Sequence, residues 1–382
     1  MSGASASAVS PPDARPTPAA PAAPAGRMAL RVALLGLGVA AMLCGLWGGL
    51  WRLGFDLPHG ASVADLHGAL LICGLFGTVI SLERAVALGR DWAFGAPALA
   101  GLGTVLLLAG APVVAGASAY ALAAAALAGV TLVVTVRQPA IFTGTLLAGA
   151  LAWLAGTVLW LTGRSIPEVS GWWLGFLVLT IAGERLELGR LMAAKTGSEA
   201  LFLLGVALLA AGAQTGLMVE TGSTLYGLAL LVLTAWLVRH DVVRHTIRQT
   251  GQTRFMAACM MAGYVWLGAA GVLLIALPPA TTAFGYDAAL HAVLIGFVLS
   301  MVFGHALIIL PAVARLRIAY RPALYVPLAV LHLSVLLRIG CDVLANDLGR
   351  AWSGPLTGVA LAGFVALIAT GVVRRKRPGL TP

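Results

Sequence analysis

Runs of roughly 20 apolar residues recur twelve times along this chain and leave it few ways to fold. A run of that length is what a helix needs to cross the hydrocarbon core of a bilayer. Within lipid, each backbone polar group must find a partner inside the protein, which favours helices. We therefore predict an all-α, polytopic bundle of about 12 transmembrane helices. The runs lie at about residues 30–51, 61–82, 92–110, 113–134, 138–162, 171–188, 199–219, 223–239, 254–277, 285–310, 322–344 and 352–373.

The composition agrees with a membrane bundle and excludes a soluble domain. Hydrophobic residues make up 60% of the 382-residue chain and charged residues only 10%, whereas soluble domains are about half apolar and about a quarter charged. The formal net charge of +10 would favour a nucleic-acid partner in a soluble protein. In a membrane protein, the positive-inside rule accounts for the same excess. We predict the lipid bilayer as the main partner and no nucleic-acid binding.

Basic residues alternate between the two sets of linkers. One set has only Arg52, Arg164 and Arg350, while the linkers after every second run are rich in Arg and Lys. Cytoplasmic loops carry such an excess, so both termini are predicted to be cytoplasmic in a multi-pass protein of the bacterial cytoplasmic (inner) membrane. The basic linker residues are Arg84, Arg90, Arg137, Arg185, Arg190, Lys195, Arg239, Arg244, Arg248, Arg254, Arg315, Arg317 and Arg321, followed by Arg374, Arg375, Lys376 and Arg377 near the C-terminus.

The domain organisation is expected to be simple. No linker is long enough for a soluble domain, so residues 27–377 are predicted to form a single 12-helix transmembrane domain. Residues 1–26 are rich in Ala, Pro and Ser, a composition that cannot bury a core, and are predicted to be a disordered tail. Residues 378–382 are assigned to a short C-terminal tail.

The run from Leu290 to Pro311 carries two histidines, His291 and His305, although it is apolar enough to span a membrane. An ionisable side chain in such a segment is costly and usually faces the bundle interior, so it is a functional-site candidate. Fourteen residues of helix separate the two rings by roughly 21 Å along the axis and bring them back to nearly the same face. One helix therefore offers an imidazole near each membrane surface.

Other polar side chains are predicted at the depth of His291. Counting from the helix ends, His67, His291 and Arg338 each lie about six residues from the outer boundary, or roughly 9 Å below it. One layer of the outer leaflet thus concentrates polar groups. Three carboxylates are expected just above this layer: Asp65, Asp287 and Asp342.

Paired imidazoles within a bundle are ligands for haem iron, copper or zinc. We predict that His67 and His291 ligate an outer centre and that His305 and His332, whose depths differ by about 6 Å, form an inner one. Arg338 is the candidate partner for haem propionates. Haem b is the expected cofactor, with copper as a second metal, and the chain has no CxxCH motif of c-type haem. Small residues near the histidines would make room for the macrocycle: Gly68, Gly74, Gly77, Gly296 and Gly304.

A short motif occurs twice, at the predicted inner ends of the second and sixth helices. Glu83-Arg84 is followed by Leu88-Gly89-Arg90, and Glu184-Arg185 by Leu188-Gly189-Arg190. Glu–Arg pairs that neutralise one another at the membrane boundary are the simplest interpretation. An ancient duplication and a proton-uptake carboxylate are the alternatives.

The predicted ligands lie in the motifs Leu66-His67-Gly68, Leu290-His291-Ala292, Gly304-His305, Leu331-His332 and Leu336-Leu337-Arg338. These motifs resemble those of the NnrS family and, more remotely, of haem-copper oxidase-type subunits. The resemblance implies a twelve-helix membrane protein with haem and copper, linked to the nitric oxide response of denitrifying bacteria. After Gly304-His305 the family continues with Thr-Gly-Arg, whereas this chain continues with Ala306-Leu307-Ile308.

Three functions are compatible with these patterns. The leading hypothesis is an integral membrane haem-binding protein, with or without copper, that handles nitric oxide, oxygen or electron transfer and has a diatomic gas or a quinol as its small-molecule partner. The second is a proton-coupled secondary transporter with a His/Arg site. The third is a structural membrane subunit whose histidines only join helices. Transporter sites are usually near the midplane, so the off-centre histidines favour the first hypothesis.

Overall fold

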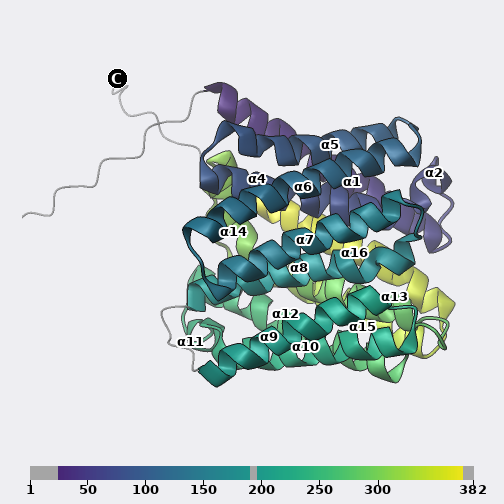
Figure 1. Cartoon of the computed structure of the whole chain (residues 1–382). Coiled ribbons are helices and arrows are strands. Elements are labelled where there is room, and N and C mark those ends of the chain that lie inside the picture. The colour runs from purple at the N-terminus through teal and green to yellow at the C-terminus, as the bar shows by residue number, and fades with distance from the viewer. Residues whose placement is uncertain (1–24, 190–195, 373–382) are drawn as a thin grey trace, which may run out of the picture.

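The computed structural model describes residues 25–189 and 196–372, and twelve of its helices are long and apolar enough to cross a membrane (Figure 1). The prediction of an all-α bundle of 12 spans is confirmed. Within the described ranges, strand-like pairing is limited to one isolated bridge between Ile318 and Val372. The spans are α1 (Ala25–Arg52); α3 (His67–Ala69) with η1 (Leu70–Phe76) and α4 (Gly77–Leu88); η2 (Asp91–Phe94) with α5 (Gly95–Leu108); α6 (Val113–Arg137); α7 (Ile141–Leu161); α8 (Ile166–Gly189); α9 (Thr196–Thr215); α10 (Glu220–His240); α12 (Gly251–Ala276); α13 (Gly285–His291) with η3 (Ala292–Leu299) and α14 (Ser300–Ala314); η4 (Pro322–Leu324) with α15 (Tyr325–Val343); and α16 (Asp347–Thr370).

Two boundaries differ from the sequence prediction. The first helix already begins at Ala25, inside the predicted tail, and the rest of that tail, like residues 373–382, lies outside the described residues. The predicted second run is broken into the short helix α2 (Gly60–Ala64) and the span that begins at His67. His67 therefore lies at the start of its span and not six residues inside it, because a turn at Asp65 and Leu66 interrupts the helix.

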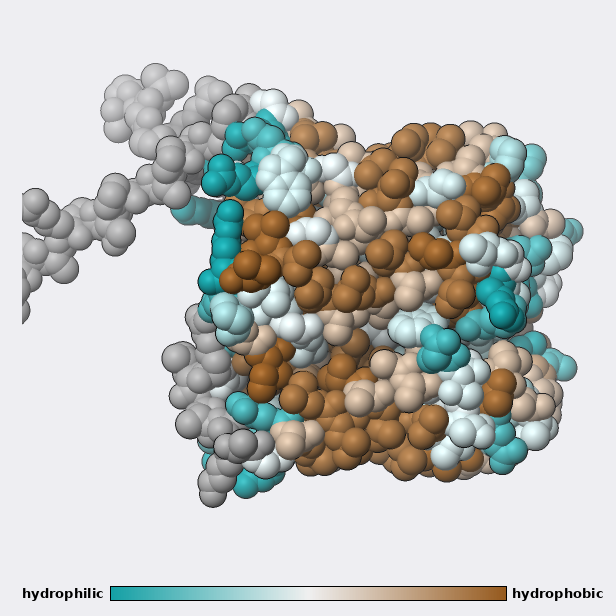
Figure 2. Space-filling model, in the orientation of Figure 1, coloured by the Kyte–Doolittle hydropathy of each residue, from teal (hydrophilic) through white to brown (hydrophobic). Residues whose placement is uncertain are grey.

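The helices lie side by side, and neighbours in sequence are mostly neighbours in space (Figure 1). The most buried spans are α8 and the one that begins at His67, whereas α1, α9 and α16 lie at the periphery. Figure 2 shows apolar side chains over the middle of the visible face and hydrophilic ones towards both ends. A bundle in lipid requires this distribution, because its middle contacts hydrocarbon and its ends contact water.

Aromatic side chains join the central helices α7 and α8. The Trp153 and Phe176 rings stack with centroids 5.0 Å apart, and Trp160 meets Trp173 edge to face at 5.6 Å. Trp173 Nε1 donates to Thr157 Oγ1 at 3.2 Å, so its polar atom is also satisfied inside the core. Such aromatic pairs bury a large apolar area between the two helices.

The repeated Glu–Arg motif forms ion pairs, but between its two copies. Arg84 Nη2 of α4 donates to Glu184 Oε1 of α8 at 2.5 Å. The second arginine, Arg185, binds Asp241 instead, with Nε to Oδ2 at 2.8 Å and Nη2 to Oδ1 at 3.2 Å. The predicted neutralisation is therefore a contact between helices and not one within each motif.

Both ends of the described chain lie with the Arg-rich linkers. Near the start of α1, Arg27 Nη2 lies 3.0 Å from Asp91 Oδ2 in the linker after α4. Near the end of α16, the Thr370 carbonyl accepts a hydrogen bond of 2.8 Å from Arg321 Nη2 in the linker after α14. We call this end of the bundle the basic face, and the opposite end, which is predicted to be external, the outer face.

The predicted orientation can be tested with cysteines at two exposed arginines. We expect a membrane-impermeant maleimide added to intact cells to label Arg164→Cys, in the linker between α7 and α8, and not Arg248→Cys on the basic face. Both should be labelled after permeabilisation. The four native cysteines are buried or half-buried, which keeps the background low. Labelling of residue 248 alone in intact cells would contradict cytoplasmic termini.

Candidate functional site

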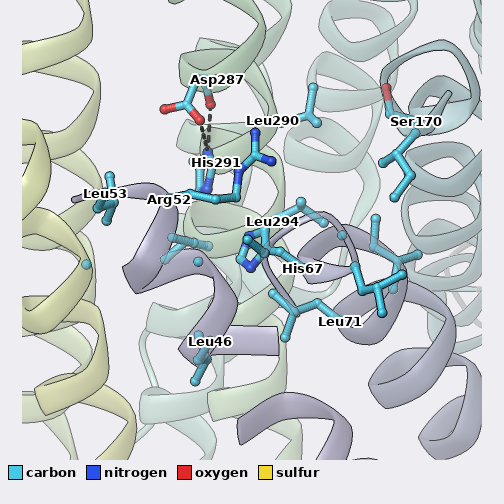
Figure 3. Close-up of a pocket in the computed structure, with 18 of the residues that line it drawn as sticks. Leu46, Arg52, Leu53, His67, Leu71, Ser170, Asp287, Leu290, His291 and Leu294 are labelled. Carbon is cyan, nitrogen blue, oxygen red and sulfur yellow. Dashed lines mark hydrogen bonds and ion pairs between the residues drawn. The ribbon is translucent and has the colours of Figure 1, made fainter. Parts of the chain in front are cut away.

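A cavity of about 560 Å³ lies at the outer face, between α1, α3, α8, α13, α15 and α16 (Figure 3). We call it the histidine cavity. Its exposed lining is mostly apolar, with Leu46, Leu71 and Trp173 among the contributors, and both His67 and His291 reach it. Small-molecule sites in proteins are mostly apolar clefts of about 300–1,000 Å³ with a few convergent polar groups. The histidine cavity has these properties.

Helix α1 positions His67 at the cavity. Its Nδ1 lies 2.6 Å from the Gly45 carbonyl oxygen, which can only accept, so Nδ1 carries the hydrogen. The ring lies against Gly49, where a Cβ would come within 2.6 Å of the His67 Cε1 atom. Glycine at position 49 therefore leaves the space that the ring occupies. In the neutral ring, the lone pair is left on Nε2.

His291 has the same arrangement of its ring nitrogens. Its Nδ1 lies 2.8 Å from the Asp287 carbonyl oxygen and 3.3 Å from Asp287 Oδ1. Both atoms accept, so Nδ1 again carries a hydrogen, and in the neutral ring Nε2 keeps the lone pair. Metal-binding histidines usually donate their other ring N–H to a carbonyl or carboxylate in this way, which fixes the tautomer and the ring orientation.

Both histidines stand at the start of a π-helical stretch. Segment η1 begins three residues after His67, and η3 begins directly after His291. Such stretches are rare within α-helices and frequently occur at functional sites. The two spans thus share a backbone irregularity at their outer histidine.

The two rings lie close enough to share one ligand. Their centroids are 6.5 Å apart and their planes differ by 21°. Two metal–nitrogen bonds of about 2.0–2.1 Å, with half a ring at each end, span roughly 6 Å. Among the described residues, no side chain or carbonyl bonds the Nε2 atom of either His67 or His291.

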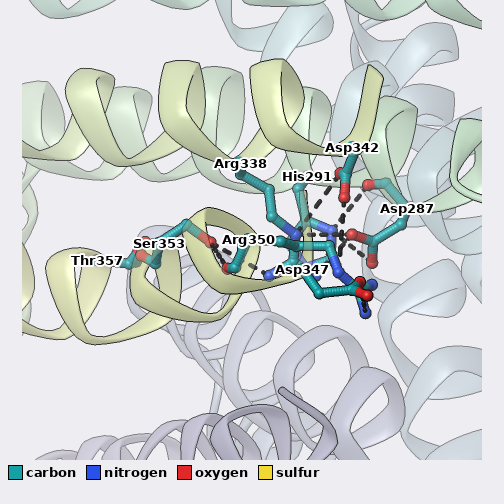
Figure 4. A network of polar contacts seen from close by, with 8 residues as sticks. All are labelled: Asp287, His291, Arg338, Asp342, Asp347, Arg350, Ser353 and Thr357. Carbon is teal, nitrogen blue, oxygen red and sulfur yellow. Dashed lines mark hydrogen bonds and ion pairs between the residues drawn. The ribbon is translucent and has the colours of Figure 1, made fainter. Parts of the chain in front are cut away.

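A network of charged groups supports His291 from the outer side (Figure 4). Asp287 Oδ2 accepts from Arg338 Nε at 2.7 Å and from Nη2 at 2.6 Å, while its Oδ1 lies near His291. Asp342, whose side chain is fully buried, lies 3.7 Å from Arg338 Nε and 3.9 Å from Arg350 Nε. One carboxylate therefore links the cavity histidine to the buried arginine of α15.

The predicted outer layer is largely brought together by this network. His67, His291 and Arg338 all line the cavity, and Asp287 and Asp342 join the charged network. The third predicted carboxylate behaves differently. Asp65 is exposed and lies 3.9 Å from Arg52, so it forms a surface pair at the rim.

His305 and His332 are not brought together as a pair. His305 Nε2 lies 3.3 Å from Arg185 Nη1, and its Nδ1 lies 2.8 Å from the Met301 carbonyl. His332 Nδ1 accepts from Trp266 Nε1 at 2.9 Å, and its Nε2 lies 3.4 Å from Ser300 Oγ. Both nitrogens of each ring are thus used within the protein. Their predicted role as ligands would require these hydrogen bonds to break.

The space beside most of the glycines that were expected to make room for a macrocycle is occupied by neighbouring side chains. A Cβ on Gly77 would meet the Trp153 ring, and one on Gly296 would meet the Trp266 ring. Of the five predicted glycines, Gly68 is the one that lines the histidine cavity. The others allow close packing between helices, the usual role of small residues in membrane bundles.

The contribution of α1 and α16 was not anticipated. Gly45 and Gly49 of α1 hold the His67 ring, and Arg350 and Ser353 of α16 line the other side of the cavity. The closely spaced glycines Gly45, Gly48 and Gly49 are the sequence signal for a close approach to α1. Nothing in the sequence indicates that the helix approaching it there is the one that begins with His67.

Two histidine nitrogens are the protein atoms that could coordinate a metal or a cofactor in the histidine cavity. Within residues 25–189 and 196–372, no group of three or more His, Cys, Asp or Glu side chains could hold a metal ion. Zinc sites normally have three or four protein ligands, and blue-copper sites use two histidines and a cysteine. Haem iron needs one or two axial ligands, because the macrocycle supplies the other four. Two histidines are within the number of protein ligands that haem iron takes.

Comparison with known protein families gives one match, over residues 31–373, to a family described as a domain of unknown function (DUF8744). The chain belongs to this family. The match covers all twelve spans apart from the first residues of α1, so the histidine cavity lies within the family's domain. Comparison with curated proteins and with solved structures found no match.

The network can be tested by removing its central carboxylate. We expect Asp287→Asn to lower the free energy of unfolding by about 3 kcal/mol, because Arg338 then stays buried beside a weaker partner. Asp347→Asn is the matched control. Its carboxylate is 82% exposed and 3.7 Å from Arg350, so its loss should cost less than about 1 kcal/mol. Equal effects in reversible unfolding in mixed micelles would refute a buried network.

The close contact at Gly49 gives a second test. We expect Gly49→Ala to destabilise the protein by about 1–3 kcal/mol, because the new methyl group overlaps the His67 ring. Gly36→Ala, in the same helix with open space around it, should stabilise it by up to about 1 kcal/mol through helix propensity. The same unfolding measurement compares them, and a stabilising Gly49→Ala would contradict the packing.

Proposed function

We propose that the protein is a membrane haem protein in which His67 and His291 would hold one b-type haem. The observation that carries this proposal is the pair of imidazoles at 6.5 Å, each with Nδ1 bonded and Nε2 left for a ligand. The cavity around them is mostly apolar, as a macrocycle requires. When bound, a haem would supply one-electron redox chemistry at this site.

The surrounding residues have separate roles in this proposal. The carbonyl oxygens of Gly45 and Asp287 accept the hydrogen on Nδ1 of the two rings. Each Nε2 is thereby left to offer its lone pair to the iron. Arg338 neutralises the charge of Asp287, and the ion pair holds the Asp287 carboxylate in place. Arg52 and Arg350 also line the cavity and provide positive charge for the propionates.

Electron transfer is the function that two histidine ligands favour. A haem held by both histidines would supply electron transfer, which needs no open coordination position, more readily than the binding of a diatomic gas. A lipophilic donor of the quinol class suits a cavity within the bilayer region. The resemblance to NnrS proteins makes nitric oxide the gas to test.

The absorption spectrum of the purified protein tests the proposal. We expect the wild type to show a Soret band and the pyridine haemochrome of haem b. Both signals should fall at least about tenfold in His67→Ala and in His291→Ala. His332→Ala is the matched control, since this histidine is also inside a span but has both ring nitrogens engaged. It should keep the spectrum.

Two outcomes would refute the proposed ligands. One is a folded, monodisperse wild-type protein with neither iron nor a Soret band, even after reconstitution with haem b. The other is retention of the wild-type spectrum in both single variants. Gel filtration and circular dichroism of each variant separate loss of haem from loss of fold.

A proton-coupled transporter is the second candidate, favoured by one specific observation. His291, Asp287 and Arg338 form a connected set of charged and titratable groups beside a cavity, next to a π-helical interruption of the span. Anion uptake driven by a proton gradient in proteoliposomes, abolished by Arg338→Gln in a protein without haem, would favour transport over electron transfer.

A further inference from the structure

A second cavity of about 560 Å³ lies at the basic face, at the opposite end of the spans from the histidine cavity. It is lined by the start of α7, the end of α8, the end of α10 and the short helix α11 (Val243–Thr246). We call it the basic cavity. The leading function does not use it, and no residue of the histidine cavity belongs to it.

A neutralised ion pair lines the buried part of the basic cavity. The Arg185 and Asp241 side chains are 3% and 0% exposed and are joined by two hydrogen bonds. Asp241 also accepts from the Tyr264 hydroxyl and from the Val243 amide. Its oxygens are therefore fully used, and its charge is compensated. Arg185 has five N–H donors, of which two remain after its bonds to Asp241 and His305.

The exposed part of the basic cavity carries two arginines that have no carboxylate partner in the described part of the chain. Arg239 and Arg244 line it, and neither forms an ion pair with any carboxylate in the described part of the chain. Arg244 Nη1 donates to the Arg239 carbonyl at 2.8 Å, which holds its guanidinium at the end of α10. Glu199 is the one other acid of the lining. Two arginines against one glutamate leave a net positive charge.

One side of the cavity is rigid. The rings of Trp236 and His240 stack with centroids 4.7 Å apart, and Trp236 Nε1 donates to the Ser198 carbonyl at 2.7 Å. His240 uses both nitrogens, on Ser198 Oγ and on the Trp236 carbonyl. The contacts tie α9 to α10 along this side of the cavity.

We propose that the basic cavity binds a phosphate-bearing anion through Arg239 and Arg244, with the remaining N–H groups of Arg185 beneath it. Guanidinium groups match phosphate oxygens with paired, charge-assisted hydrogen bonds. A lipid headgroup or a soluble phosphate supplies the same chemistry. On the predicted cytoplasmic side, the leaflet is rich in anionic lipids.

The positive-inside rule alone does not account for this arrangement. That rule requires only exposed basic residues on the cytoplasmic side, and Arg248 satisfies it in the same linker without lining the cavity. Arg239 and Arg244 differ from it because they border a space large enough for a ligand. Arg248 is therefore the matched control.

The test measures ligand binding to the full-length protein in neutral detergent. Phosphatidylglycerol, phosphatidylcholine and inorganic phosphate are each titrated, with the emission of tryptophan, including Trp236 in the cavity lining, and lipid adducts in native mass spectra as readouts. We expect saturable binding of phosphatidylglycerol, weakened at least about tenfold in the double variant Arg239→Gln/Arg244→Gln. Arg248→Gln should bind as the wild type does, and phosphatidylcholine should bind more weakly than phosphatidylglycerol.

The outcomes separate the two sources of phosphate. Arginine-dependent binding of inorganic phosphate without phosphatidylglycerol would assign the site to a soluble anion. Absence of saturable binding of both anions would overturn the proposal, as would equal binding by the wild type and the double variant, or equal loss in Arg248→Gln. Both substituted arginines are exposed, and gel filtration confirms that the double variant keeps its fold.

Discussion

The cost of a polar group without a partner in hydrocarbon organises this molecule. Ion pairs between helices satisfy several of its ionisable groups inside the bundle: Arg84 with Glu184, Arg185 with Asp241, and Arg338 with Asp287. Each pair joins different helices, so the same contacts that remove unpaired charge also fix how the helices are arranged. Breaking such a pair leaves a charge buried alone, which costs more than the pair itself contributes.

Against this pattern, the Nε2 atoms of His67 and His291 stand out. His305 and His332 lie within spans too, but both nitrogens of each ring are bonded inside the protein. A membrane histidine with one nitrogen held by a carbonyl and the other left at a cavity is arranged for a ligand. The difference between the two kinds of histidine lies in the neighbours and not in the residue type.

The two cavities give the bundle different chemistry at its two faces. The outer one is mostly apolar and is lined by two imidazole rings, which suits a large, flat, apolar cofactor. The one at the basic face has guanidinium groups around a neutralised ion pair, which suits an anion. The helix formed by α13, η3 and α14 contributes to both ends, with His291 at one cavity and His305 bonded to the buried arginine of the other.

Helix count followed from the sequence alone, because hydrophobic length determines it, and a fixed rise per residue placed some side chains in a common layer. On that basis His291 and Arg338 were expected in one layer, and Asp287 indeed joins them. The depth of His67 was less accurate, because a turn at Asp65 and Leu66 shifts the start of its helix.

Only the tertiary structure decided which helices are neighbours, and so which side chains are partners. Arg84 pairs with the glutamate of the other motif, and tryptophan rings pack against Gly77 and Gly296. Gly49 leaves space for the His67 ring. The physical reason is that depth is a property of one helix, whereas a contact depends on the rotation and packing of two. The sequence by itself determined the layer in which a site could form, and packing selected the two histidines that share it.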